Sequence, residues 1–202
     1  MCSERKRSMT HISFDGDSPN SPKHTFDVLD YKLNLDIRSC FITPFPRSFT
    51  GSVIVKFRID TALSSINLNA INTSIVVSSV GMSGVSFTHT GNILNVVLNR
   101  VYNPGEVTEV LVNYSHNNVV DGAIYTGNGG FFTDAPPEGA RKWFPCWDKP
   151  SDKATVDITL KVPSNVKIGS NGRLNDSTVT GDTTYYHWIS RDPVTTYLTV
   201  LT

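Results

Sequence analysis

Strict alternation of apolar and polar side chains is the feature that most constrains this chain. It is clearest at residues 30–38, 51–60 and 154–162, where every second residue is apolar. Successive side chains of an extended strand point to opposite faces, so each segment predicts a strand with one face on a core and one in water. Further strands are predicted at 65–70, 74–80, 85–88, 93–98, 108–114, 184–189 and 194–201, separated by turn residues such as Gly, Pro and Asn. The pattern predicts antiparallel sheets.

The composition agrees with a fold made of strands. Val, Ile and Thr together supply 55 of the 202 residues, whereas there are six Ala, four Glu and no Gln. Scarce helix formers and abundant β-branched residues argue against a helical bundle or a helix-rich α/β enzyme. We therefore predict an all-β protein, a bent antiparallel β-sandwich with a saddle-like double sheet. Residues 25–202 are expected to form a single all-β domain, and residues 1–24 a polar flexible N-terminal tail.

Charge and hydropathy exclude two classes of partner. Lys and Arg together number 18, as do Asp and Glu, so the net charge is zero and no bulk field recruits nucleic acid. No stretch approaches 18 consecutive apolar residues, and we predict no membrane span.

The three cysteines, Cys2, Cys40 and Cys146, form no C-x-x-C pair. An odd number without that spacing argues against a disulfide framework and a cysteine-ligated zinc site. Buried free thiols are the favoured interpretation, and a Cys40–Cys146 bridge stays open.

One segment, residues 121–154, breaks the alternation and concentrates Gly, Pro and aromatic residues. Long irregular segments of compact domains are usually functional loops or loops held by their own aromatic side chains. If the loop is held by its own aromatic side chains, Trp143 and Phe144 are buried, and Arg141 lies on an aromatic ring or beside Asp148.

The same segment resembles the N-terminal domain of the aminopeptidase N family of zinc metallopeptidases (gluzincins). The family run A-R-x-x-F-P-C-x-D-E-P-x-x-K-A is matched at Ala140, Arg141, Phe144, Pro145, Cys146, Asp148, Pro150, Lys153 and Ala154. Further matches follow at 162–163 and 170–172, and the resemblance covers about residues 24–202. The residues of this run are most similar to those of bacterial members of the family. The resemblance implies that the matched residues, from Arg141 to Lys153, form a structural motif.

The resemblance also implies what this chain lacks. Family members remove N-terminal residues from peptides with a zinc ion held by H-E-x-x-H on a separate catalytic domain. This chain has five histidines, none followed by Glu. The resemblance therefore implies no catalytic residue and no metal ligand in this chain, which is inactive alone. Its implied partners are the catalytic domain of the same polypeptide, which carries the zinc, and the N-terminus of a peptide in the parent protein.

A substrate-side role is implied for the loop before Arg141. In the family a Gln or Glu five residues before the motif Arg holds the substrate's α-amino group, and a companion Gln lies seven before it. Those positions are Pro136 and Asp134 here, so Asp134 and Glu138 are the candidate amine anchors. Lys149 stands where the family has Glu.

A second prediction for this loop concerns Phe131 and Phe132. Adjacent side chains of an extended segment point in opposite directions, so at least one of the two rings should be exposed.

The alternative function is a non-enzymatic extracellular β-sandwich binding module, whose composition would be similar. The ordered motif between residues 141 and 154 favours the peptidase domain. Acidic residues of the loop, Asp134, Glu138, Asp148 and Asp152, give a weaker case for a glycosidase pair or a calcium site, because no cleft or EF-hand spacing is visible. A secreted or periplasmic location is expected.

Overall fold

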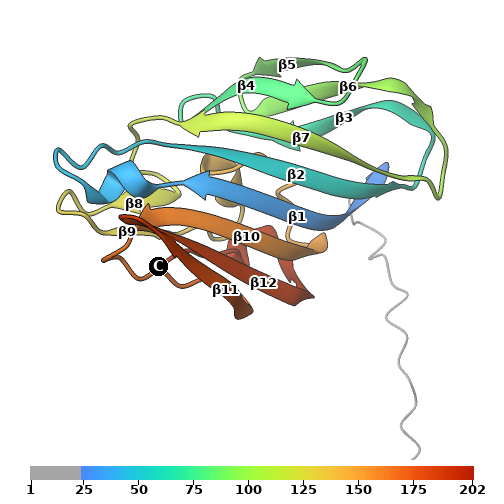
Figure 1. The fold of residues 1–202 in the computed structure, drawn as a ribbon. Coiled ribbons are helices and arrows are strands. Elements are labelled where there is room, and N and C mark those ends of the chain that lie inside the picture. The colour runs from blue at the N-terminus through green and yellow to red at the C-terminus, as the bar shows by residue number, and fades with distance from the viewer. Residues whose placement is uncertain (1–23) are drawn as a thin grey trace, which may run out of the picture.

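The computed structural model describes residues 24–202 as an all-β fold of twelve strands in three sheets (Figure 1). The predicted tail, except for His24, lies outside the described residues. The seven-stranded sheet has the order β11 (Arg173–Thr180), β12 (Thr183–Thr195), β10 (Lys153–Pro163), β1 (Phe26–Asp36), β2 (Phe49–Ile59), β7 (Val107–His116) and β4 (Ile75–Gly81). The three-stranded sheet has the order β3 (Leu63–Asn69), β6 (Ile93–Tyr102) and β5 (Ser86–Thr90), and a hairpin joins β8 (Ala123–Tyr125) to β9 (Phe131–Thr133). Short 3-10 turns lie at Arg38–Phe41, Ala140–Lys142 and Thr196–Leu198.

The inward faces of these sheets share one hydrophobic core. On β1, Tyr31, Leu33 and Leu35 are buried, whereas Lys32 and Asn34 between them are exposed. The same alternation holds along β2 and β10. Burying each large apolar side chain contributes about 1.5–3 kcal/mol, so this face holds the sheets together. The predicted all-β sandwich is confirmed.

The direction of one strand pair differs from the prediction. β1 and β10 pair in parallel, and the other paired strands of the three sheets are antiparallel. A parallel pair needs a long crossover, which the chain between Asp36 and Lys153 supplies. The alternation of side chains shows which face is buried but carries no information on the direction of a neighbouring strand.

The sequence also misplaced several strand boundaries. The strand predicted at 194–201 is wrong, because β12 ends at Thr195 and a 3-10 turn follows at Thr196–Leu198. β8 and β9 were not predicted, since each has only three residues. β11 was not predicted either, because all eight of its residues are exposed and its two faces do not differ in polarity.

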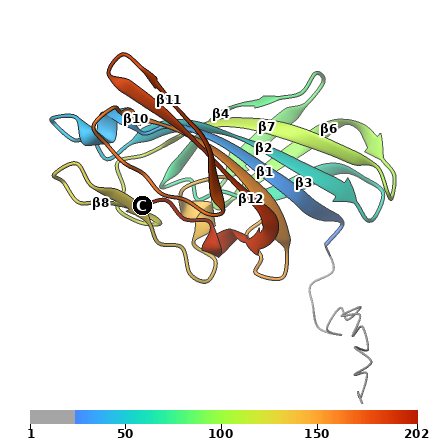
Figure 2. The same cartoon turned by 60° about the horizontal axis from the view of Figure 1, so that its bottom comes forward.

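The irregular segment 121–154 lies below the large sheet in Figure 2 and is fastened to the core. Trp143 and Phe144 are fully buried, as predicted, and their rings lie 4.4 Å apart between centroids. The backbones of Asn69 and Cys146 exchange two hydrogen bonds of 2.7 and 3.1 Å, which tie the segment to the end of β3. Cys40 and Cys146 are free and buried, which confirms the prediction of buried thiols for these two residues, and Cys2 lies outside the described residues. Burial raises the pKa of the Cys40 thiol to about 11.

We predict that Trp143→Ala or Phe144→Ala lowers the free energy of unfolding by about 3–5 kcal/mol, because each change leaves a cavity in a packed core. Urea denaturation monitored by circular dichroism measures the loss. The control is Lys56→Ala on the exposed face of β2, which should change stability by no more than about 0.5 kcal/mol. Unchanged midpoints for both aromatic variants would mean that the segment does not stabilise the core.

Candidate functional site

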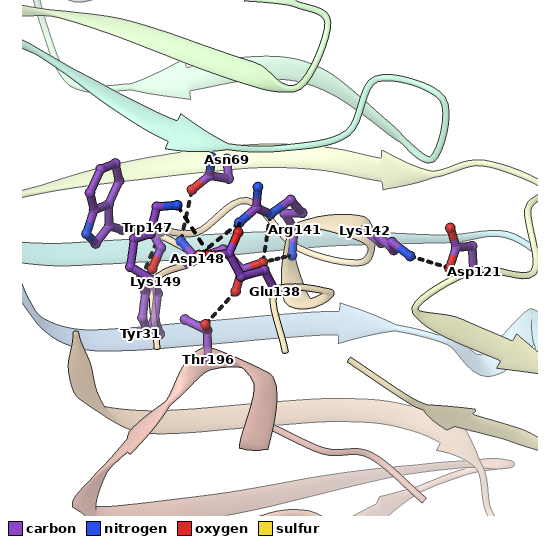
Figure 3. Close-up of polar contacts among 10 residues, drawn as sticks. All are labelled: Tyr31, Asn69, Asp121, Glu138, Arg141, Lys142, Trp147, Asp148, Lys149 and Thr196. Atoms are coloured by element: carbon purple, nitrogen blue, oxygen red, sulfur yellow. Dashed lines mark hydrogen bonds and ion pairs between the residues drawn. The ribbon is translucent and has the colours of Figure 1, made fainter. Parts of the chain in front are cut away.

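Arg141 of segment 121–154 pairs with one fully buried carboxylate, that of Asp148 (Figure 3). Arg141 donates to Asp148 Oδ2 from its Nε at 2.8 Å and from its backbone N–H at 3.2 Å. The hydroxyl of Thr196 donates to Oδ1 at 2.6 Å, and the Arg141 guanidinium also reaches the Asp148 carbonyl at 2.9 Å. Each carboxylate oxygen therefore has a donor, which a buried charge requires.

Asp148 joins parts of the chain that are far apart in sequence. Its backbone N–H donates to the side-chain oxygen of Asn69, at the end of β3, over 3.0 Å. Thr196 lies in the 3-10 turn after β12. Two partners were predicted for Arg141, an aromatic ring or Asp148. The structure shows that Arg141 pairs with Asp148.

Glu138 and Lys149 extend this ion cluster toward solvent. Glu138 Oε2 lies 2.5 Å from the Arg141 guanidinium, and Oε1 lies 3.3 Å from Lys149 Nζ. Lys149, which replaces the acid of the family motif, therefore pairs with an acid of the same loop. Burial lowers the pKa of Arg141. The hydrogen bond to Asp148 and the charges of Asp148 and Glu138 raise this pKa by a larger amount, so it lies above its usual value. The cluster holds two acids, Glu138 and Asp148, and two bases, Arg141 and Lys149, so its charges balance.

Asp134 lies outside this cluster, directly after β9, and is exposed. Phe131, Thr133 and Ala135 are buried, whereas Phe132 and Asp134 alternate with them and are exposed. The exposed fraction is 6% for Phe131 and 40% for Phe132, which confirms the prediction that the two rings point apart. The backbone N–H of Asp134 donates to the Gly122 carbonyl at 3.0 Å, so its backbone position is fixed.

An aromatic cluster supports the β8–β9 hairpin from its buried side. The Phe131 ring packs edge-on against Phe49 and Tyr125. The hydroxyl of Tyr125 lies 3.0 Å from Nδ1 of the buried His116, whose ring stacks on Phe49. Burial lowers the pKa of His116 to about 4, so it is neutral near pH 7 and does not add charge to the core.

The remaining residues of the predicted motif divide by burial. Phe144, Pro145 and Cys146 are buried, whereas Pro150 and Lys153 are exposed. The structure therefore brings Arg141, Glu138, Asp148 and Lys149 together and leaves Asp134, Pro150 and Lys153 outside the cluster. Sequence reasoning missed Asn69 and Thr196, which are 79 and 48 positions from Asp148 and carry no local motif.

The zinc ion that the family resemblance implies is expected on a separate catalytic domain and not on this chain. Residues 24–202 contain no group of three or more His, Cys, Asp or Glu side chains placed to hold a metal ion. A separate finding is that this part of the chain has no helix with the length and apolar character needed to cross a membrane.

Comparisons with known proteins agree on one family. The model of the family described as Peptidase M1 N-terminal domain matches residues 27–198. Aminopeptidase M1 of Arabidopsis thaliana is 28% identical over 191 residues, which is 85% of this chain and 21% of the relative. Aminopeptidase M1-A of Oryza sativa subsp. japonica is 31% identical over 176 residues, 75% of this chain and 19% of the relative. The chain thus spans about a fifth of the length of these curated relatives.

Solved structures show the same similarity in three dimensions. The M1 zinc metallopeptidase from Deinococcus radiodurans has a TM-score of 0.77 and 25% sequence identity, and the match covers 88% of this chain and 41% of that chain. A variant of that protein bound to a Tyr-ser-ala substrate matches with the same TM-score and identity over 42% of its chain.

We predict that Asp148→Ala lowers the free energy of unfolding by about 3–5 kcal/mol, because Arg141 then keeps a partly buried charge without its main partner. Urea denaturation at pH 7 measures the change. Asp121→Ala is the control, since it removes an exposed ion pair with Lys142 and should cost no more than about 1 kcal/mol. Equal losses in the two variants would contradict a stabilising role for the buried carboxylate.

A second prediction concerns Asp152, a buried residue that is 5% exposed. Burial and the nearby Asp27 and Asp60 raise its pKa to about 6, although the Val28 N–H and His24 act in the opposite direction. Between about pH 4 and 6 the folded state therefore holds a proton that the unfolded state has released. The stability that this proton uptake by Asp152 contributes is full below about pH 4 and is lost as the pH rises through about 6.

Asp152→Asn should remove that part of the pH dependence, which is on the order of 2–3 kcal/mol. Urea midpoints of the two proteins measured between about pH 4 and 7 make the comparison. Parallel pH profiles would show that Asp152 titrates normally.

Proposed function

The chain belongs to the Peptidase M1 N-terminal domain family, and on that premise we propose that it forms the substrate-side domain of a zinc-dependent aminopeptidase. In this proposal the parent protein removes N-terminal residues from peptides, and a separate domain of the same polypeptide carries the zinc. The names of the relatives support it, since the curated proteins are aminopeptidases and the solved ones are M1 zinc metallopeptidases.

The observation that carries the proposal is an exposed carboxylate on a fixed backbone. On one side of Asp134, the Thr133 N–H donates to the Leu201 carbonyl at 3.0 Å. On the other, Arg141 is fastened to Asp148. Between these points Asp134 is exposed, and within residues 24–202 no cation lies at ion-pair distance from it. A carboxylate held in this way can accept charge-assisted hydrogen bonds from the α-ammonium group of a peptide.

Asp134 is the first candidate for the amine anchor, and Glu138 is the second. Both carboxylate oxygens of Glu138 already face cations, Arg141 and Lys149, which compete with a substrate amine. In the proposal Glu138 keeps the loop in place, and Asp134 binds the amine.

The face around Asp134 also has the character of a covered surface. Phe132 is exposed on β9, two positions before Asp134. Leu198 and Val200 are 47% and 39% exposed on the C-terminal segment. That segment adjoins β9, because Leu201 N–H donates to the Thr133 hydroxyl at 2.9 Å. Exposed apolar residues gathered in this way are typical of an interaction surface. We assign it to the catalytic domain of the parent.

The first test uses the 202-residue chain alone. We predict no hydrolysis of amino-acid amides with or without added zinc, because the described residues offer no metal site. Metal-dependent turnover by the pure chain would overturn the proposed division of roles.

The second arm joins this chain to the catalytic domain of the Deinococcus radiodurans protein, in place of that protein's own first domain. The chimera should hydrolyse peptides with a free N-terminus, and Asp134→Ala should raise KM about tenfold or more with a smaller change in kcat. Asp121→Ala, an exposed acid of the same segment, should leave KM unchanged. An active chimera whose KM is insensitive to Asp134→Ala, or which cleaves N-acetylated peptides equally well, would exclude Asp134 as the anchor.

A further inference from the structure

The outer face of the seven-stranded sheet carries a row of uncharged polar side chains that crosses the strands. Strand register places Thr159 of β10 opposite Asn34 of β1, which lies opposite Ser52 of β2. Ser52 in turn lies opposite Asn113 of β7, and Asn113 opposite Ser79 of β4. Thr159, Asn34, Ser52 and Asn113 alternate with the core residues of their strands, so they face away from the core. The side-chain amide of Asn113 donates to the Ser79 hydroxyl at 3.0 Å, so Ser79 lies on the same face. Figure 1 shows the strands side by side in this order.

Charged residues lie on other parts of the same face. Two residues further along the strands, Asp157 lies opposite Lys32, which lies opposite Ile54 of β2. Beyond them Asp30 lies opposite Lys56, which lies opposite Glu109. The uncharged row carries only hydroxyl and carboxamide groups.

Four residues of the row, Thr159, Asn34, Ser52 and Asn113, line a hollow of about 570 Å³, within the size range of small-molecule sites. Gly51 also contributes to its lining. A second hollow of about 580 Å³ shares four of its lining residues, Asp36, Thr50, Ser115 and Lys161. The two hollows therefore adjoin and together form the groove.

The electrostatics of the groove favour an uncharged ligand. Its ionic side chains are paired, with Lys161 Nζ 2.7 Å from Asp36 Oδ2 and Arg38 paired with Asp182. No excess charge is left to select an anion or a cation. Hydroxyl and carboxamide groups both donate and accept hydrogen bonds, and the hydroxyls of a sugar do the same.

The backbone of the sheet disfavours a peptide in this groove. The four strands β10, β1, β2 and β7 each pair with a neighbour on both sides, so their N–H and C=O groups cannot bind an added strand. Only side chains are available to a ligand. At the rim Tyr185 lies opposite Lys161 and is 40% exposed, so its ring offers an apolar platform with a polar tip.

We propose that this groove binds a neutral oligosaccharide, which lies across β10, β1, β2 and β7 with one sugar ring against Tyr185. At a strand spacing of about 4.8 Å, the five strands of the row span about 19 Å, which accommodates a short linear oligosaccharide. The groove lies on the face opposite the core and does not include Asp134, so it is independent of the proposed peptidase role.

The test titrates the 202-residue chain with five neutral hexasaccharides: cellohexaose, maltohexaose, xylohexaose, mannohexaose and hexa-N-acetylchitohexaose. Calorimetry should give a Kd at or below about 1 mM for at least one of them, and NMR should show shifts in β10, β1, β2 and β7. Asn113→Ala and Tyr185→Ala should each weaken binding at least about fivefold. Asn67→Ala, which changes the same kind of side chain on the outer face of the three-stranded sheet, is the matched control and should have no effect.

Ser52→Trp gives an independent check, because it fills the groove without removing a core contact, and it should abolish binding. Urea midpoints establish that each variant is folded. Three results would overturn the proposal: no hexasaccharide binds, binding is insensitive to all three groove variants, or a neutral Gly-Ser hexapeptide binds the groove as tightly as the best sugar.

Discussion

The buried ion pair between Arg141 and Asp148 is the interaction on which the candidate site depends. A carboxylate out of contact with water is tolerated only when its oxygens are hydrogen-bonded and its charge is balanced. Arg141 and Thr196 satisfy Asp148, and Asn69 accepts from its backbone. Because these partners come from three distant stretches, the same contacts that neutralise the charge also fix the loop on the core.

The loop can present functional groups because its aromatic side chains hold it from below. Trp143 and Phe144 fill the core under the 3-10 turn, and Phe131 packs against Phe49. Burial of alternate side chains leaves Phe132 of β9 and Asp134, directly after it, exposed. A backbone fixed on one side therefore exposes an acid and an apolar ring on the other, as the proposed amine anchor and domain contact require.

The large sheet gives the molecule two chemically different faces. Its inner face is apolar and packs on the smaller sheets, whereas the outer face carries the uncharged groove. The mixed topology contributes to this arrangement, since the parallel pairing of β1 with β10 sets Thr159 beside Asn34. In the loop, Lys149 replaces the acid of the family motif and pairs with Glu138.

The sequence by itself determined the features that local geometry controls. The alternation predicted which faces of β1, β2 and β10 are buried, the motif pointed to Arg141 and Asp148, and the opposite directions of Phe131 and Phe132 followed from an extended backbone. Only the tertiary structure decided the direction of β10, the roles of Asn69 and Thr196, and the transverse polar row. These depend on the register between segments as much as 125 positions apart, which no local pattern of side chains encodes.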